Sequence, residues 1–154
     1  MKIDLKDKPY VEVATLGGLG RVRLMPGTAA CLAALPFYLF LQSGALFFIF
    51  TVLSMVLAFA VCTRAENALG KKDHKSMVID DFCGMLITFL FVPYDFRVML
   101  AGFFLFRMLD MLKVFPANLA EKQPGSIGVV GDDVIAGIYA NIILRTAIYF
   151  AFKL

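Results

Sequence analysis

The stretch ALFFIFTVLSMVLAFAVC, residues 45–62, decides the fold of this chain. It contains no charged residue, and about 20 consecutive apolar residues suffice for a helix to cross the hydrocarbon core of a bilayer. The preceding apolar stretch, AACLAALPFYLFL at 29–41, is separated from it only by residues 42–44. Gly44 favours a tight turn, so the two stretches predict a helical hairpin. Its first helix is short, begins near Leu24 or crosses only part-way, and is kinked by Pro36.

Three more apolar stretches follow, at 77–92, 98–112 and 134–152. Polar loops at 63–76 and 113–133 and a short turn at 93–95 separate them. The pattern predicts an all-α integral membrane protein, a bundle of about five short helices with four to five spans, one of them partial. We expect one membrane domain over residues 1–154, with a polar, interfacial N-terminal segment at 1–23.

Composition supports a membrane class. The chain is 60% hydrophobic and 18% charged, whereas soluble domains average about 45–50% apolar and 25% charged residues. A net charge of +3 is too small to indicate nucleic-acid binding. Cys31, Cys62 and Cys83 lie in apolar stretches without metal-ligand spacing, so we expect buried thiols. The first 20 residues hold no apolar core of signal-peptide length, so no cleaved signal is expected.

Positive charges fall on one side of the predicted topology. If all five stretches cross, the N-terminal segment and the loops after the second and fourth spans share a side. These segments carry Lys2, Lys6, Lys8, Arg21, Arg23, Arg64, Lys71, Lys72, Lys75, Lys113 and Lys122. The opposite side carries only Arg97 and Lys153. The positive-inside rule therefore places the basic side in the cytoplasm.

Carboxylates gather at the cytoplasmic ends of the same spans. Asp80 and Asp81 lie at the start of the third apolar stretch, Asp110 at the end of the fourth, and Asp132 and Asp133 at the start of the last. Charged groups at membrane depth are costly and by default indicate function. The sequence Pro-Gly-Thr at 26–28 lies at the same predicted depth.

Asp110 has a basic residue on each side at helical spacing. Arg107 precedes it by three residues and Lys113 follows by three. Side chains at i and i+3 meet on a helix surface, so the three form a charged stripe that we expect to face protein or water.

Many carboxylates and a single histidine favour a hard cation with oxygen ligands. Magnesium fits this set and commonly works beside phosphates, whereas zinc would need nitrogen or sulfur ligands. The expected chemistry is metal-assisted hydrolysis on a phosphate headgroup. We expect the metal ligands and general base to come from Asp80, Asp81, Asp110, Asp132 and Asp133. Phosphate would be bound by Thr28, Arg107 and Lys113, with Arg21, Arg23 and His74 as further headgroup contacts.

Structural roles remain open for each of these residues. One aspartate of each Asp-Asp pair could cap a helix, Thr28 could do the same, and Asp110 could serve only to neutralise Arg107. His74 could be a plain surface histidine.

Four segments together resemble the phosphatidylglycerophosphatase A family of bacterial inner-membrane enzymes. They are PGT at 26–28, DHKSMVIDDFCGM at 73–85, GFFLFRMLDMLKVFP at 102–116 and GDDVIAG at 131–137. The resemblance implies a magnesium-dependent phosphatase that converts phosphatidylglycerophosphate to phosphatidylglycerol and inorganic phosphate at the cytoplasmic leaflet, with no obligate protein partner. The chain departs from the family pattern at Asp81, usually Glu, at Ala30-Cys31, usually Gly-Ser, and at Val114, usually Pro.

Two other functions remain compatible with the residues. One is a phosphatase for another lipid phosphate, such as phosphatidate or a prenyl phosphate. The other is a non-enzymatic membrane protein, such as a small transporter. A transport pathway should continue polar residues across the bilayer, and the far half holds few, namely Thr51, Thr88, Asn141 and Arg145.

Overall fold

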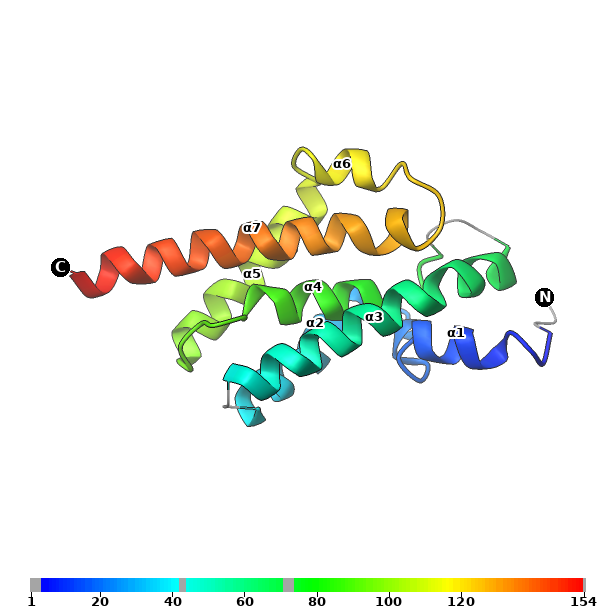
Figure 1. The fold of residues 1–154 in the computed structure, drawn as a ribbon, viewed down its shortest axis with the longest axis horizontal. Coiled ribbons are helices and arrows are strands. Elements are labelled where there is room, and N and C mark those ends of the chain that lie inside the picture. Colours follow the sequence, from blue (N-terminus) through cyan, green and yellow to red (C-terminus); the bar gives the residue numbers. More distant parts are fainter. Residues whose placement is uncertain (1–3, 42–43, 71–73, 154) are drawn as a thin grey trace.

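The computed structural model describes residues 4–41, 44–70 and 74–153, and this part of the chain is helical without any strand (Figure 1). The helices are α1 Lys8–Ala14, the 3₁₀ turn η1 Leu19–Arg21, α2 Pro26–Phe40, α3 Gly44–Leu69, α4 Ile79–Thr88, α5 Phe96–Leu112, α6 Ala117–Ala120 and α7 Ser126–Lys153. The all-α prediction is confirmed. Lys2, Gln42, Ser43, Lys71, Lys72, Asp73 and the side chain of Lys153 lie outside the described residues.

Several predicted boundaries were wrong. α3 continues to Leu69 and α7 begins at Ser126, so both helices extend into segments expected to be loops. The third apolar stretch, expected at 77–92, is helical only over ten residues of α4. The N-terminal segment is more than a polar tail, because α1 packs on α3 with Val11 and Ala14 buried.

Two helices are long and apolar enough to cross a membrane. α3 and residues 126–151 of α7 meet this criterion by length and composition, with mean hydropathies of 2.7 and 1.6. At 1.5 Å per residue each of these two 26-residue segments is about 39 Å long. Only 28% of the apolar window of α3 is buried inside the protein, so most of its apolar side chains face outward. A soluble protein rarely exposes apolar surface of that extent.

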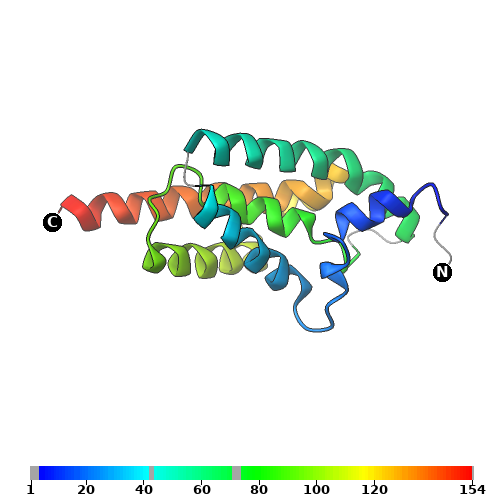
Figure 2. The ribbon, with the colours of Figure 1, turned by 90° about the horizontal axis from the view of Figure 1, so that it is seen from below.

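α4 lies in the middle of the bundle, where Figures 1 and 2 show it surrounded by longer helices. It packs against α2, α3, α5 and α7, and all its residues except Asp81 are buried. At about 15 Å, it is too short to cross a hydrocarbon core by itself. The helix that carries two acidic residues is therefore covered by protein.

Glycines set the distance between α4 and α7. A methyl group at Gly137 of α7 would lie 2.5 Å from the carbonyl oxygen of Gly84 on α4. A methyl group at Gly84 would in turn lie 2.6 Å from the Phe106 ring and 2.8 Å from the carbonyl oxygen of Asp133. Only glycine at both positions lets the two backbones approach this closely. This contact brings the acidic turn of α7 next to the acidic turn of α4.

The end of α3 is joined to the start of α7 by polar contacts. The backbone N–H of Thr63 donates to Ser126 Oγ at 2.9 Å, and the N–H of Ser126 donates to Thr63 Oγ1 at 2.9 Å. At the same end of the molecule, the N–H of Val78 donates to the carbonyl of Ala14 at 3.0 Å. The N-terminal segment therefore fixes the chain immediately before α4.

A Gly137→Ala substitution should force α4 and α7 apart and lower stability. Overpacking of this kind costs about 1–3 kcal/mol, which for a chain of this size corresponds to roughly several degrees of melting temperature. Gly131→Ala is the matched control on the same helix, because its methyl group would meet only Ala120 Cβ, at 3.4 Å. Thermal unfolding in detergent measures both variants. Equal melting temperatures for Gly137→Ala and the wild type would contradict the packing role.

Candidate metal and phosphate site

A charged pocket of about 340 Å³ opens where the first turns of α2 and α4, the last turn of α5 and the N-terminal third of α7 meet. Four helices therefore contribute to one site. The lining residues are Met25, Pro26, Gly27, Lys75, Met77, Asp80, Asp81, Arg107, Asp110, Met111, Lys113, Val129, Asp132 and Asp133. The five aspartates expected to share one membrane depth all reach this pocket.

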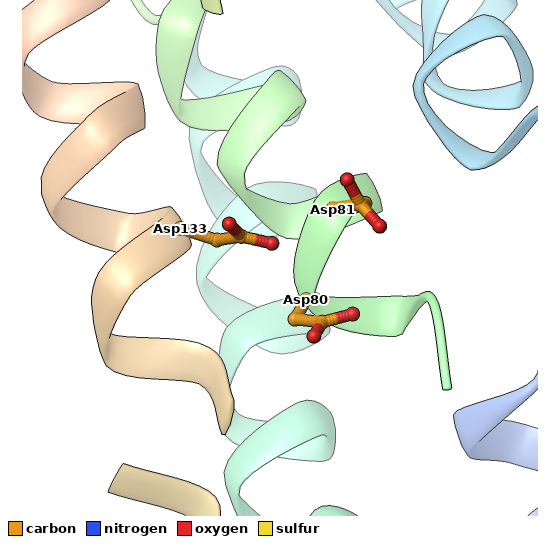
Figure 3. Close-up of side chains that lie close together, drawn as sticks. All are labelled: Asp80, Asp81 and Asp133. Atoms are coloured by element: carbon orange, nitrogen blue, oxygen red, sulfur yellow. The ribbon is translucent and has the colours of Figure 1, made fainter. Parts of the chain in front are cut away.

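Three of these aspartates form a compact cluster. Figure 3 shows Asp133 pointing from α7 toward α4, which carries Asp80 and Asp81. One carboxylate oxygen from each residue lies within 4.8 Å of the other two. Asp80 and Asp133 are only 6% and 4% exposed. Like charges this close repel strongly where water is scarce, so the cluster is suited to a bound cation.

The start of α2 borders the cluster. Met25, the residue before the helix, adopts a left-handed conformation with φ of 52°, and Pro26 occupies the first helical turn. A methyl group at Gly27 would overlap the Asp81 carboxylate, so glycine is required where the two elements touch. The first N–H groups of a helix lack intrahelical partners and carry partial positive charge, which favours anions. The turn therefore presents backbone donors beside the carboxylate cluster.

Arg107 joins two of the helices through carboxylates. Its Nη1 donates to Asp110 Oδ2 at 2.8 Å, as the i,i+3 spacing predicts, and also to Asp81 Oδ1 on α4. Cys31 Sγ lies beneath this pair, 3.9 Å from Arg107 Nη1. The guanidinium is thus oriented by Asp81 and Asp110 at the pocket wall.

Lys113 is held in a similar way. It ends α5 in a left-handed conformation with φ of 45°, and its Nζ donates to Asp132 Oδ2 at 2.8 Å and lies 2.9 Å from Glu121 Oε1. Burial alone would lower the pKa of Lys113, but the bonds to Asp132 and Glu121 outweigh burial and raise it. The ammonium therefore remains charged at neutral pH.

The helix-capping roles considered for four of the acids and for Thr28 are wrong. α4 is preceded by Val78, α2 by Met25, and α7 starts at Ser126, six residues before Asp132. The pairing of Asp110 with Arg107 is confirmed. Asp110 also lines the pocket, so the ion pair and a role in the site are compatible.

Some expected contacts lie outside the pocket lining. Arg21 pairs with Glu12 at 2.7 Å and is exposed, as is Arg23. His74 Nδ1 lies 2.8 Å from Ser76 Oγ in the loop before α4. Thr28 Oγ1 is buried behind the lining and has no hydrogen-bond partner among the described residues. Their predicted roles stay predictions.

Two polar residues at the site were not predicted from the sequence. Lys75 lines the pocket and was counted only as a loop charge, although it lies inside the quoted segment 73–85. Glu121 orients Lys113 from the turn after α6, and no sequence signal pointed to it. The methionines at 25, 77 and 111 were missed because apolar residues carry no signal of a site in an apolar chain.

The donor set fits magnesium. Mg²⁺ takes oxygen ligands, is bound through few carboxylates and keeps several waters. Asp80, Asp81 and Asp133 offer three carboxylates that converge from two helices. Asp110 and Asp132 are bonded to Arg107 and Lys113, and Asp81 is also bonded to Arg107. Three of the five predicted aspartates thus form the carboxylate cluster, and Asp81, Asp110 and Asp132 each contact a basic side chain.

One family model and two similar proteins carry the same name. A family model described as Phosphatidylglycerophosphatase A matches residues 12–148. The phosphatidylglycerophosphatase A of Escherichia coli K12 is 33% identical over 140 residues, covering 88% of this chain and 81% of that protein. The protein of the same name from Haemophilus influenzae is 36% identical over 132 residues, covering 82% and 81%.

A third relative has a different name. The "Putative phosphatidylinositol-3-phosphatase" of Bacteroides thetaiotaomicron is 32% identical over 147 residues, covering 89% of this chain and 92% of that protein. No solved structure matches the chain. The family match runs from within α1 to within α7 and includes all pocket residues, and it confirms the resemblance of the four segments. The chain belongs to the phosphatidylglycerophosphatase A family.

Proposed function

We propose that this protein is a magnesium-dependent lipid phosphatase of the bacterial inner membrane. It hydrolyses phosphatidylglycerophosphate to phosphatidylglycerol and inorganic phosphate at the cytoplasmic leaflet. The observation that carries the proposal is the cluster of Asp80, Asp81 and Asp133, with oxygens within 4.8 Å of one another, in a pocket that also holds basic side chains. Family membership supplies the reaction, since two relatives are named for it.

The charge balance of the pocket supports a divalent cation. Five aspartates contribute five negative charges, and Lys75, Arg107 and Lys113 contribute three positive charges, which leaves a formal charge of −2. One divalent cation would neutralise the site before substrate arrives. The pocket could then receive a phosphate dianion without a net repulsive charge.

Asp80, Asp81 and Asp133 would hold the magnesium ion, which when bound activates water and offsets charge on phosphoryl oxygens. Arg107 and Lys113, fixed in place by Asp81, Asp110, Asp132 and Glu121, bind the terminal phosphate. The first N–H groups of α2 donate to its remaining oxygens. In the reaction the oxygen of water bonds to phosphorus, the bond from phosphorus to the glycerol oxygen breaks, and that oxygen takes up a proton.

Apolar surface and charge support a multi-pass membrane location. α3 and α7 are long enough to span, and α2 and α5 expose apolar side chains such as Phe40 and Phe104. Residues near the start of α7 line the pocket, and Figure 1 shows α7 beginning on the side of the molecule where α3 ends. Because the basic segments predicted to be cytoplasmic adjoin these helix ends, the site faces the cytoplasm.

A second substrate class is favoured by one relative. The Bacteroides protein, whose name refers to a phosphatidylinositol 3-phosphate, is 32% identical. Both lipids carry a phosphate monoester on a polyol headgroup, and the pocket chemistry suits either. Purified protein should release phosphate from phosphatidylglycerophosphate with a kcat/KM at least about tenfold above that for phosphatidylinositol 3-phosphate, a difference of roughly 1.4 kcal/mol. The reverse order would assign the second substrate.

Asp110→Asn should abolish most turnover without loss of the protein from the membrane. The substitution removes one of two carboxylates that orient Arg107, and loss of preorganised charge at a phosphoryl site costs roughly 100-fold in kcat. Asp7→Asn is the control, since Asp7 lies before α1 and outside the pocket lining. Phosphate release in detergent is compared at equal amounts of folded protein. Activity of Asp110→Asn close to that of the wild type would remove Asp110 from the site.

Magnesium should stabilise the protein as well as activate it. An ion that binds only the folded state raises stability by RT ln(1 + [L]/Kd), about 2.7 kcal/mol at 100 times Kd. Excess chelator should lower the melting temperature and stop phosphate release, and magnesium should restore both. In Asp133→Asn the thermal shift should be lost. An unchanged shift in that variant would place the ion elsewhere.

A further inference from the structure

The mouth of the charged pocket is flanked by exposed methionines. Met25 and Met111 both line the pocket, yet their side chains are 62% and 71% exposed. Residues that share a pocket wall with aspartates and also face outward must border its opening. One borders it from the turn before α2 and the other from the last turn of α5. The opening is therefore apolar although the interior is charged.

An apolar stripe runs along the helix beside each methionine. On α5 the exposed residues Leu100, Phe104 and Met108 lead to Met111 at spacings of four, four and three. On α2 the exposed residues Leu32 and Leu39 lie seven residues apart, and Met25 immediately precedes the helix. Helical periodicity places the four residues of α5 on one face of that helix, and Leu32 and Leu39 on one face of α2. The first turn of α2 and the last turn of α5 line the pocket, so each stripe runs away from the pocket along its helix. Figure 2 shows both helices extending from there toward the side of the molecule where the C-terminus lies.

Basic residues also lie near the opening. Arg23 lies two residues before Met25 and is exposed, and Lys75 lines the pocket. Cationic side chains beside exposed apolar ones match the boundary between lipid headgroups and acyl chains. A water-soluble phosphate ester would require no apolar mouth, whereas a diacyl lipid would gain from one.

We propose that the pocket is entered sideways from the bilayer, between Met25 and Met111, with the acyl chains of the substrate along the stripes of α2 and α5. The inference rests on the proposed function and adds the substrate's lipid part. The glycerol backbone lies at the two methionines while the terminal phosphate reaches the aspartate cluster. Contacts of Met25 and Met111 with the lipid part of the substrate thus favour a membrane lipid over a soluble phosphate ester with the same headgroup.

The test compares two substrates with the same headgroup. One is long-chain phosphatidylglycerophosphate in vesicles, and the other is the dihexanoyl form, kept monomeric in solution. Met25→Gln and Met111→Gln should lower kcat/KM for the vesicle substrate about tenfold more than for the soluble one, since each removes an apolar contact of the lipid part. Ile127→Gln is the matched control, because Ile127 is 60% exposed at the start of α7 and does not line the pocket. In Ile127→Gln the kcat/KM for each of the two substrates should stay at the wild-type value.

Equal losses on both substrates, or no loss, would overturn the lateral entry. A second readout, photocrosslinking, is independent of turnover. The probe is a lipid that carries the same headgroup and a photoreactive diazirine near the acyl carbonyl. It should crosslink to peptides that contain Met25 or Met111 more than to a peptide that contains Ile127. Crosslinking at Ile127 alone would also overturn the proposal. If wild-type protein hydrolyses neither substrate while the crosslinks fall at the methionines, the proposed reaction fails and the entry path stands.

Discussion

The contact between Gly84 and Gly137 is the constraint on which the site depends. It allows α4 and α7 to approach until backbone touches backbone, and Asp133 lies one turn before Gly137 on the same helix. Without that approach Asp133 could not reach the turn that carries Asp80 and Asp81. Packing in the apolar interior therefore determines the spacing of charged groups at one end of the bundle. The remaining helices cover α4, so that the carboxylates open only to the pocket.

Ion pairs between the charged groups of the pocket join its helices. Arg107 ties α5 to α4 through Asp81, and Lys113 ties the end of α5 to α7 and to the segment after α6. Breaking one partner of such a buried pair leaves an uncompensated charge, which costs more than the pair contributes. The three helices are thus held together at the site by ion pairs and away from it by apolar packing. This division lets the site be charged without weakening the bundle.

Much of this arrangement could be predicted from the sequence, because apolar length and charge position are local properties. The stretches that became α2, α3, α5 and α7 were recognisable, and all five aspartates of the pocket were selected. Helix ends were harder: Thr63 and Ser126 appear polar and loop-like, yet each satisfies the other's backbone and extends a helix. The pair of Asp110 with Arg107 could be predicted because it follows the i,i+3 spacing of one helix. The role of Asp132 could not, because its contact with Lys113 joins α7 to the end of α5. Glu121 could not be predicted either, because its contact with Lys113 joins the residue after α6 to the end of α5.

The central position of α4 has a consequence for how the protein is made. The ten residues of α4 are covered by other helices, so α4 finds its packing partners only within the protein. These partners include α7, which follows the other described helices along the chain. The cluster of Asp80, Asp81 and Asp133 can therefore form only after α7 has been synthesised and has docked against α4.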